Sequence, residues 1–125
     1  MSRSFRYAVL GVVLAVLGAP AAHAESFSAL GKQGYAVGPM GQGKSGALGW
    51  VVSKGGSKFF CRLRASSAYS GGNGMVSFTT SGRMIKMNRA VYEATIGGHD
   101  PSIPQLADLK AGRVRPADVG ACSRI

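Results

Sequence analysis

The chain has 125 residues, of which 15 are lysine or arginine and five are aspartate or glutamate, giving a formal net charge of +10 at pH 7. This length suits one domain with a modest hydrophobic core, and the positive charge favours anionic partners. Beyond residue 24 the chain has one histidine, His99, and two cysteines, too few ligands for a four-ligand zinc site. Serines are plentiful, but no G-x-S-x-G elbow is present, so we expect no enzyme, no catalytic residue, no metal and no cofactor.

Residues 1–24 have the pattern of a cleaved secretory signal peptide. Arg3 and Arg6 precede an apolar run from Tyr7 to Ala19, and Ala22-His23-Ala24 is an A-x-A cleavage pattern. The apolar run is shorter than the roughly 20 residues that span a bilayer. We therefore expect cleavage after Ala24, no integral membrane anchor, and a periplasmic or secreted protein.

Residues 25–46 form a glycine-rich N-terminal segment in which only Gln33 to Val37 has the composition of a short strand. Gly38 to Ser45 (GPMGQGKS) matches the G-x-x-x-x-G-K-[ST] phosphate-loop pattern letter for letter. That pattern binds nucleotides only where a helix N-terminus follows the lysine, and residues 46–52 resemble a strand instead. We expect a flexible loop with an exposed Lys44, and no nucleotide.

Residues 47–64 carry the clearest structural pattern, a β-hairpin around Gly55-Gly56. A two-residue glycine loop suits the right-handed twist of paired strands, and it sets the register. On the apolar face this register pairs Val52 with Phe59, Trp50 with Cys61 and Leu48 with Leu63. The opposite face then carries three cations and an aromatic ring: Lys58, Phe60, Arg62 and Arg64.

Residues 65–96 are expected to extend this hairpin into an antiparallel meander, because Asn73-Gly74 and Ser81-Gly82 are turn signals. A tight turn at Asn73-Gly74 places Tyr69 opposite Phe78. A tight turn at Ser81-Gly82 predicts four pairs: Phe78 with Ile85, Val76 with Met87, Ser77 with Lys86, and Met75 with Asn88. Ala90 to Ile96 allows a helix, but its alternation favours a strand.

The remaining residues are expected to hold a short helix and the second cysteine. Ser102 can cap a helix that runs to Lys110, and Gly112 can end it. Export favours a Cys61–Cys122 disulfide. The predicted fold is mainly β (α+β): residues 47–125 form one small antiparallel β-meander domain with a short C-terminal helix and one disulfide.

Charge is distributed unevenly along the chain. From Ser26 to Tyr92 there are nine cations and no acidic residue. Such a field attracts anionic partners, which outside the cytoplasm include acidic polymers and acidic proteins rather than nucleic acid. We therefore expect a binding protein without catalytic activity that engages an anionic polymer or acidic protein of the cell envelope. Its candidate contacts are Lys58, Phe60, Arg62, Arg64 and Lys86.

The alternative function is a protein–protein interaction module, such as an inhibitor of an envelope hydrolase. In that case the glycine-rich loop from Gly38 to Gly46 would contact the partner through Lys44 and Ser45. His99 lies in a glycine-bounded loop next to Asp100, and an aspartate that is next in sequence rarely orients a histidine ring. We expect His99 to be an ordinary polar loop residue.

Overall fold

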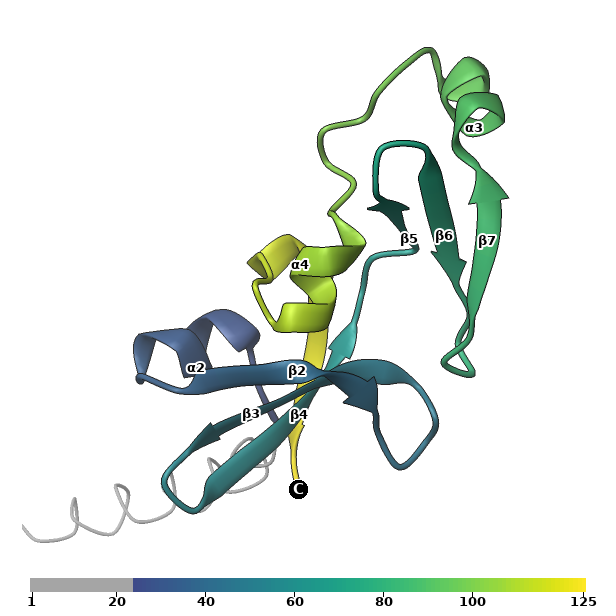
Figure 1. Cartoon of the computed structure of the whole chain (residues 1–125). Helices are drawn as coiled ribbons and strands as arrows, with labels where there is room; N and C mark the ends of the chain where they lie inside the picture. Colours follow the sequence, from purple (N-terminus) through teal and green to yellow (C-terminus); the bar gives the residue numbers. More distant parts are fainter. Residues whose placement is uncertain (1–23) are drawn as a thin grey trace, which may run out of the picture.

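The computed structural model describes residues 24–125, which contain two antiparallel sheets and three short α-helices (Figure 1). The expected signal peptide, residues 1–24, lies outside this part except for Ala24. The larger sheet has the order β1 (Ala24–Glu25), β8 (Val119–Arg124), β4 (Ser57–Leu63), β3 (Leu48–Lys54), β2 (Ala36–Gln42). The smaller sheet has the order β5 (Ser67–Ser70), β6 (Gly74–Phe78), β7 (Met84–Asn88). The mainly antiparallel β fold predicted from the sequence is confirmed. The expected extension of the β3–β4 hairpin into one meander is wrong, because β5, β6 and β7 form a separate sheet.

The helices are α2 (Phe27–Lys32), α3 (Arg89–Ile96) and α4 (Leu106–Ala111), and a 3₁₀ turn covers Pro116–Asp118 just before β8. Leu30 of α2 and Leu109 of α4 join the buried cluster around Trp50. Both helices therefore pack on the same face of the larger sheet. Within residues 24–125, none of the helices is long and apolar enough to cross a membrane.

The hairpin formed by β3 and β4 has the predicted register. Trp50 lies opposite Cys61, Val52 opposite Phe59, and Lys54 and Ser57 flank the Gly55-Gly56 loop. Gly55 has a φ of +59°, a conformation that favours glycine. Because strand side chains alternate, Trp50 and Val52 are buried in the core while Val51 points to the opposite face.

The predicted disulfide between Cys61 and Cys122 is present. The two cysteines lie opposite each other on β4 and β8, and both are buried. The bridge therefore fixes the C-terminal strand against the central hairpin in one register.

Trp50 connects the larger sheet to α4. Its side chain is fully buried, and its indole N–H donates a hydrogen bond of 2.7 Å to the carbonyl oxygen of Leu109. Leu109 is itself fully buried, and a buried carbonyl group needs a hydrogen-bond partner. The Trp50 indole is that partner.

The predicted register of β6 and β7 is wrong by one residue. Phe78 lies opposite Met84, Ser77 opposite Ile85, Val76 opposite Lys86, and Met75 opposite Met87. The turn has three residues rather than two, because the N–H of Thr79 donates to the carbonyl of Arg83 and Gly82 has a φ of +87°. A slip of one residue moves each side chain to the other face, so Lys86 lies on the face of Val76.

The turn before β6 also differs from the prediction. Tyr69 lies opposite Met75 rather than Phe78, because the strands β5 and β6 close at Ser70 and Gly74. Gly71, with a φ of +70°, begins the loop between them. Asn73-Gly74 therefore does not form a two-residue turn by itself.

The segment from Ala90 to Ile96 is helical, and the predicted strand is wrong. The Asn88 side chain accepts a hydrogen bond of 3.0 Å from the N–H of Val91, and Gly97 ends α3 in the left-handed region. In addition, α4 begins at Leu106 rather than after Ser102, because the Ser102 hydroxyl donates to the Asp100 carboxylate instead. Gly112 ends α4 as predicted.

Candidate functional site

The candidate site lies on the face of the larger sheet that α2 and α4 do not cover. On this face Val51 pairs with Phe60, and Gly49 pairs with Arg62. The side chains of Lys58 and Arg62 are exposed and Phe60 is half-buried. The outward face that the sequence predicts for the hairpin is therefore accessible within the described part of the chain.

The Phe60 ring packs over two glycines. A Cβ atom placed on Gly43 would lie 2.7 Å from Cε2 of Phe60, and one placed on Gly49 would lie 2.7 Å from its Cζ. Both distances are shorter than van der Waals contact allows. The ring therefore occupies the space that side chains at these two positions would take, and it contacts the start of the turn between β2 and β3.

A groove of about 410 Å³ opens beside this ring. Its apolar side chains are Val51, Phe60 and Ile125, its cations are Lys44 and Arg62, and the remaining lining residues are Gln42, Gly43, Ser45 and Ser123. No acidic side chain lines it. The volume lies in the range of small-molecule sites, and the lining combines an apolar floor with positive charge.

Backbone hydrogen bonds shape the turn that contributes Lys44 and Ser45. The N–H of Gly43 donates to the carbonyl of Ala47 at 2.9 Å, and the N–H of Gly46 donates to the carbonyl of Gly43 at 3.0 Å. The Gln42 amide also donates to the Gly46 carbonyl at 3.1 Å. The sequence predicts a flexible loop from Gly38 to Ser45, but β2 continues through Gln42, so the predicted loop is wrong for the first part of this pattern. The prediction that a strand rather than a helix follows the turn is confirmed, because β3 begins at Leu48.

The structure brings together residues from both candidate sets predicted from the sequence. Lys44 and Ser45 of the proposed interaction loop line the same groove as Phe60 and Arg62 of the hairpin face. Lys58 shares the strand face with Phe60 but does not line the groove.

Two other predicted residues lie elsewhere. Arg64 follows the end of β4 and borders a separate hollow of about 210 Å³ with Leu63 and Phe78. Lys86 lies on β7 in the smaller sheet, opposite Val76. Neither residue lines the groove at Phe60.

Three lining residues were not among the candidates from the sequence: Val51, Ser123 and Ile125. The hairpin register already placed Val51 beside Phe60. Ser123 lies opposite Phe60 because the neighbouring cysteines are paired, so the predicted disulfide could have indicated it. Ile125 is exposed, and its N–H donates to the carbonyl of Lys58.

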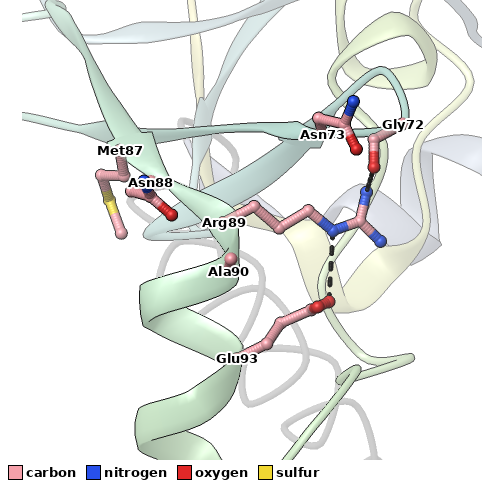
Figure 2. Close-up of a pocket in the computed structure, with 7 residues that line it drawn as sticks. All are labelled: Gly72, Asn73, Met87, Asn88, Arg89, Ala90 and Glu93. Atoms are coloured by element: carbon pink, nitrogen blue, oxygen red, sulfur yellow. Dashed lines mark hydrogen bonds and ion pairs between the residues drawn. The ribbon is translucent and has the colours of Figure 1, made fainter.

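A second polar cluster surrounds Arg89, at the start of α3 (Figure 2). Its Nε donates to Glu93 at 3.1 Å, and its Nη1 donates to the carbonyls of Gly71 at 3.1 Å and Gly72 at 2.8 Å. Its guanidinium lies 4.2 Å from the ring centre of buried Tyr69. A hollow of about 570 Å³ lies beside it. Since most of its donors bind protein groups, Arg89 connects α3 to the β5–β6 turn.

His99 and Asp100 belong to the same cluster. The His99 ring stacks on Tyr69 with 4.9 Å between ring centres, and the Tyr69 hydroxyl accepts a hydrogen bond of 2.9 Å from the N–H of Asp100. The Ser102 hydroxyl and N–H both donate to the Asp100 carboxylate, which lowers its pKa. The Asp118 carboxylate raises the pKa of Arg115, whose guanidinium also donates to the carbonyl of Ser102 at 2.7 Å. These contacts support a structural role for the loop.

Replacing Arg89 by lysine should lower the free energy of unfolding by about 1–2 kcal/mol, because an ammonium group lacks the planar fork that serves Glu93 and two carbonyls together. Urea denaturation measures this change, and hydrogen exchange at Gly97 and Gly98 should become faster because both donate to the carbonyl of Glu93. Arg83→Lys, at an exposed position, is the control. Equal stability of the two variants would contradict the role of Arg89.

No protein-family model, curated protein or solved structure matches the chain. Within residues 24–125, no three side chains of His, Cys, Asp or Glu converge as ligands for a metal ion. The functional interpretation therefore depends on the geometry and charge of the groove at Phe60 and of the polar cluster around Arg89.

Proposed function

We propose that this chain is an exported, non-enzymatic binding protein that engages an anionic component of the cell envelope through the groove at Phe60. The observation that supports this most directly is the groove lining, which places Lys44 and Arg62 beside an apolar floor without any acidic side chain. An anion that enters the groove meets the positive charge of these two side chains and no acidic side chain of the lining.

The surroundings of the groove strengthen its positive field. Lys58 lies one pleat further along the same face of β4, and residues 26–92 contain no acidic residue. Interactions between exposed charges decay over about 8 Å at physiological ionic strength. Lys44 and Arg62 therefore make the main electrostatic contribution to a bound anion, while the other cations attract the anion toward the groove. Binding should therefore weaken as salt concentration rises.

The compartment is supported by two independent features. The Cys61–Cys122 disulfide is consistent with an extracellular or other oxidising compartment. The pattern of residues 1–24 suggests export through a cleaved signal peptide. A periplasmic or secreted location would expose the groove to phosphorylated lipids, acidic glycans and acidic proteins.

The groove is tested by comparing two variants that lose the same charge. Lys44→Ala with Arg62→Ala should bind a phosphate-bearing matrix about three- to tenfold more weakly than the unchanged protein, since each exposed ion pair contributes under about 1 kcal/mol. Lys32→Ala with Lys110→Ala removes two exposed cations from α2 and α4 and should bind almost normally. The measurement is the salt concentration at which each variant elutes.

Equal weakening in both variants would show that retention follows net charge alone, and it would remove the groove from the site. The alternative function, an inhibitor or interaction module, uses the same Lys44 and Ser45 surface. A photoreactive group at exposed Ser45 distinguishes the two functions in a periplasmic extract. One stoichiometric cross-linked protein would favour the interaction module.

A further inference from the structure

We infer that the ligand of the Phe60 groove is a single-chain phosphorylated lipid, whose phosphate binds at Lys44 and Arg62 and whose hydrocarbon chain lies over Val51, Phe60 and Ile125. This inference depends on the proposed function and names the class of its ligand. A simple polyanion would use the cations but leave the apolar floor in water.

The cations of the groove lie at one end of β4, and the apolar floor runs from there, where the Phe60 ring packs over Gly43 and Gly49, toward the other end. Arg62 is two residues beyond Phe60 on the same face of β4 and pairs with Gly49. Gly49 is near the start of β3, directly after the turn that contains Lys44. Ile125 lies at the other end, since its N–H donates to the carbonyl of Lys58. The exposed side chain of Lys58 is on the same strand face but does not line the groove. Phe60 lies between the two ends. A molecule with one charged end and one apolar end matches this order.

The apolar side chains are available for contact. Val51 is 39% exposed and Ile125 is 59% exposed. A hydrocarbon chain that covers them removes apolar surface from water, which stabilises the complex in proportion to the buried area. With a volume of about 410 Å³, the groove is at the small end of the range for ligand sites, which favours one chain over two.

The polar end suits a phosphate group. Lys44 and Arg62 provide positive charge and several N–H donors, and the Ser45 hydroxyl provides another donor. Phosphate oxygens accept bonds from guanidinium and ammonium groups together. The charge of the lining is complementary to this head group, because no acidic residue lines the groove.

The test is isothermal titration of the oxidised protein with dodecyl phosphate in monomeric form. Inorganic phosphate and the neutral amphiphile dodecyl maltoside are the comparison ligands. Dodecyl phosphate should bind with 1:1 stoichiometry and at least about tenfold more tightly than either, because only it uses both ends of the groove.

Ile125→Ser should weaken binding of dodecyl phosphate several-fold. Ile85→Ser, at an equally accessible apolar position in the smaller sheet, should leave it unchanged. Both positions are exposed, so neither change removes a core contact. Val51→Ser provides a second variant in the groove.

Three outcomes would overturn the inference. If inorganic phosphate binds as tightly as dodecyl phosphate, the site recognises an anion alone, and the proposed function stands without the lipid. Equal binding of dodecyl maltoside would remove the role of charge and contradict the proposed function as well. If no single-chain ligand binds while matrix retention still depends on Lys44 and Arg62, only the lipid inference fails.

Discussion

Replacing Cys61 and Cys122 by alanine should lower the free energy of unfolding by about 4 kcal/mol. The bridge joins residues separated by 61 positions, and on the loop-entropy model a closed loop of that length restricts the unfolded chain by about this amount. Alanine is the suitable replacement because both sites are buried, where the hydroxyl of serine would need a hydrogen-bond partner. Urea denaturation of both proteins measures the difference.

Reduction of the unchanged protein provides the control, because it opens the same loop without altering the side-chain atoms other than sulfur. Its stability should approach that of the double alanine variant. A difference below about 1 kcal/mol between oxidised and reduced protein would contradict the prediction, since it would mean that the bridge restricts the unfolded chain very little.

The same bridge should matter for the groove. β8 contributes Ser123 to the groove and leads into Ile125, while β4 contributes Phe60 and Arg62. Without the bridge, only the strand hydrogen bonds and side-chain packing hold these two walls together. Opening of β8 should then become more frequent, and the amide of Ile125, which donates to the carbonyl of Lys58, should exchange faster with solvent.

Replacing Trp50 by alanine should lower the free energy of unfolding by about 3–5 kcal/mol, because a fully buried large side chain is lost. Trp50→Phe should cost less, about 1–3 kcal/mol, because it keeps an aromatic ring but leaves the Leu109 carbonyl without its donor. Because Trp50 is the single tryptophan, both variants lose tryptophan fluorescence, and far-UV circular dichroism is the suitable measurement of unfolding.

The adjacent residue provides the control for Trp50. Val51 is on the other face of β3 and is 39% exposed, so Val51→Ala should cost less than about 1 kcal/mol. A cost as large as that of Trp50→Ala would show that the groove face is part of a packed core, and this result would argue against a binding surface there.

The hairpin could be predicted from the sequence because its determinants are local. A Gly-Gly loop and strict alternation within residues 47–64 allow one register with an apolar side. The second hairpin lacks this constraint. Met84, Ile85 and Met87 place apolar side chains on both faces of β7, so alternation did not distinguish a two-residue turn from the three-residue turn that forms.

The helix α3 was missed for a related reason. None of its residues is buried, so no core contact required a helix here. Tyr92 and Ile96 are spaced for one helix face as well as for one strand face, and the alternation of Tyr92, Ala94 and Ile96 resembled a strand. The useful signals were at its ends. Asn88 caps its first turn and Gly97 ends it, and both residue types are typical of these positions.

The sequence by itself determined the disulfide partners, the excess of positive charge, and the shared strand face of Lys58, Phe60 and Arg62. Only the tertiary structure decided that the Lys44 turn folds beside Phe60, that β8 brings Ile125 to the groove, and that Lys86 lies in another sheet. The physical reason is the range of the interactions. A short loop fixes the register of the two strands that it joins. Pairing between strands that are distant in the sequence instead requires long loops to close, which costs conformational entropy. Core burial and the Cys61–Cys122 bridge together offset that cost.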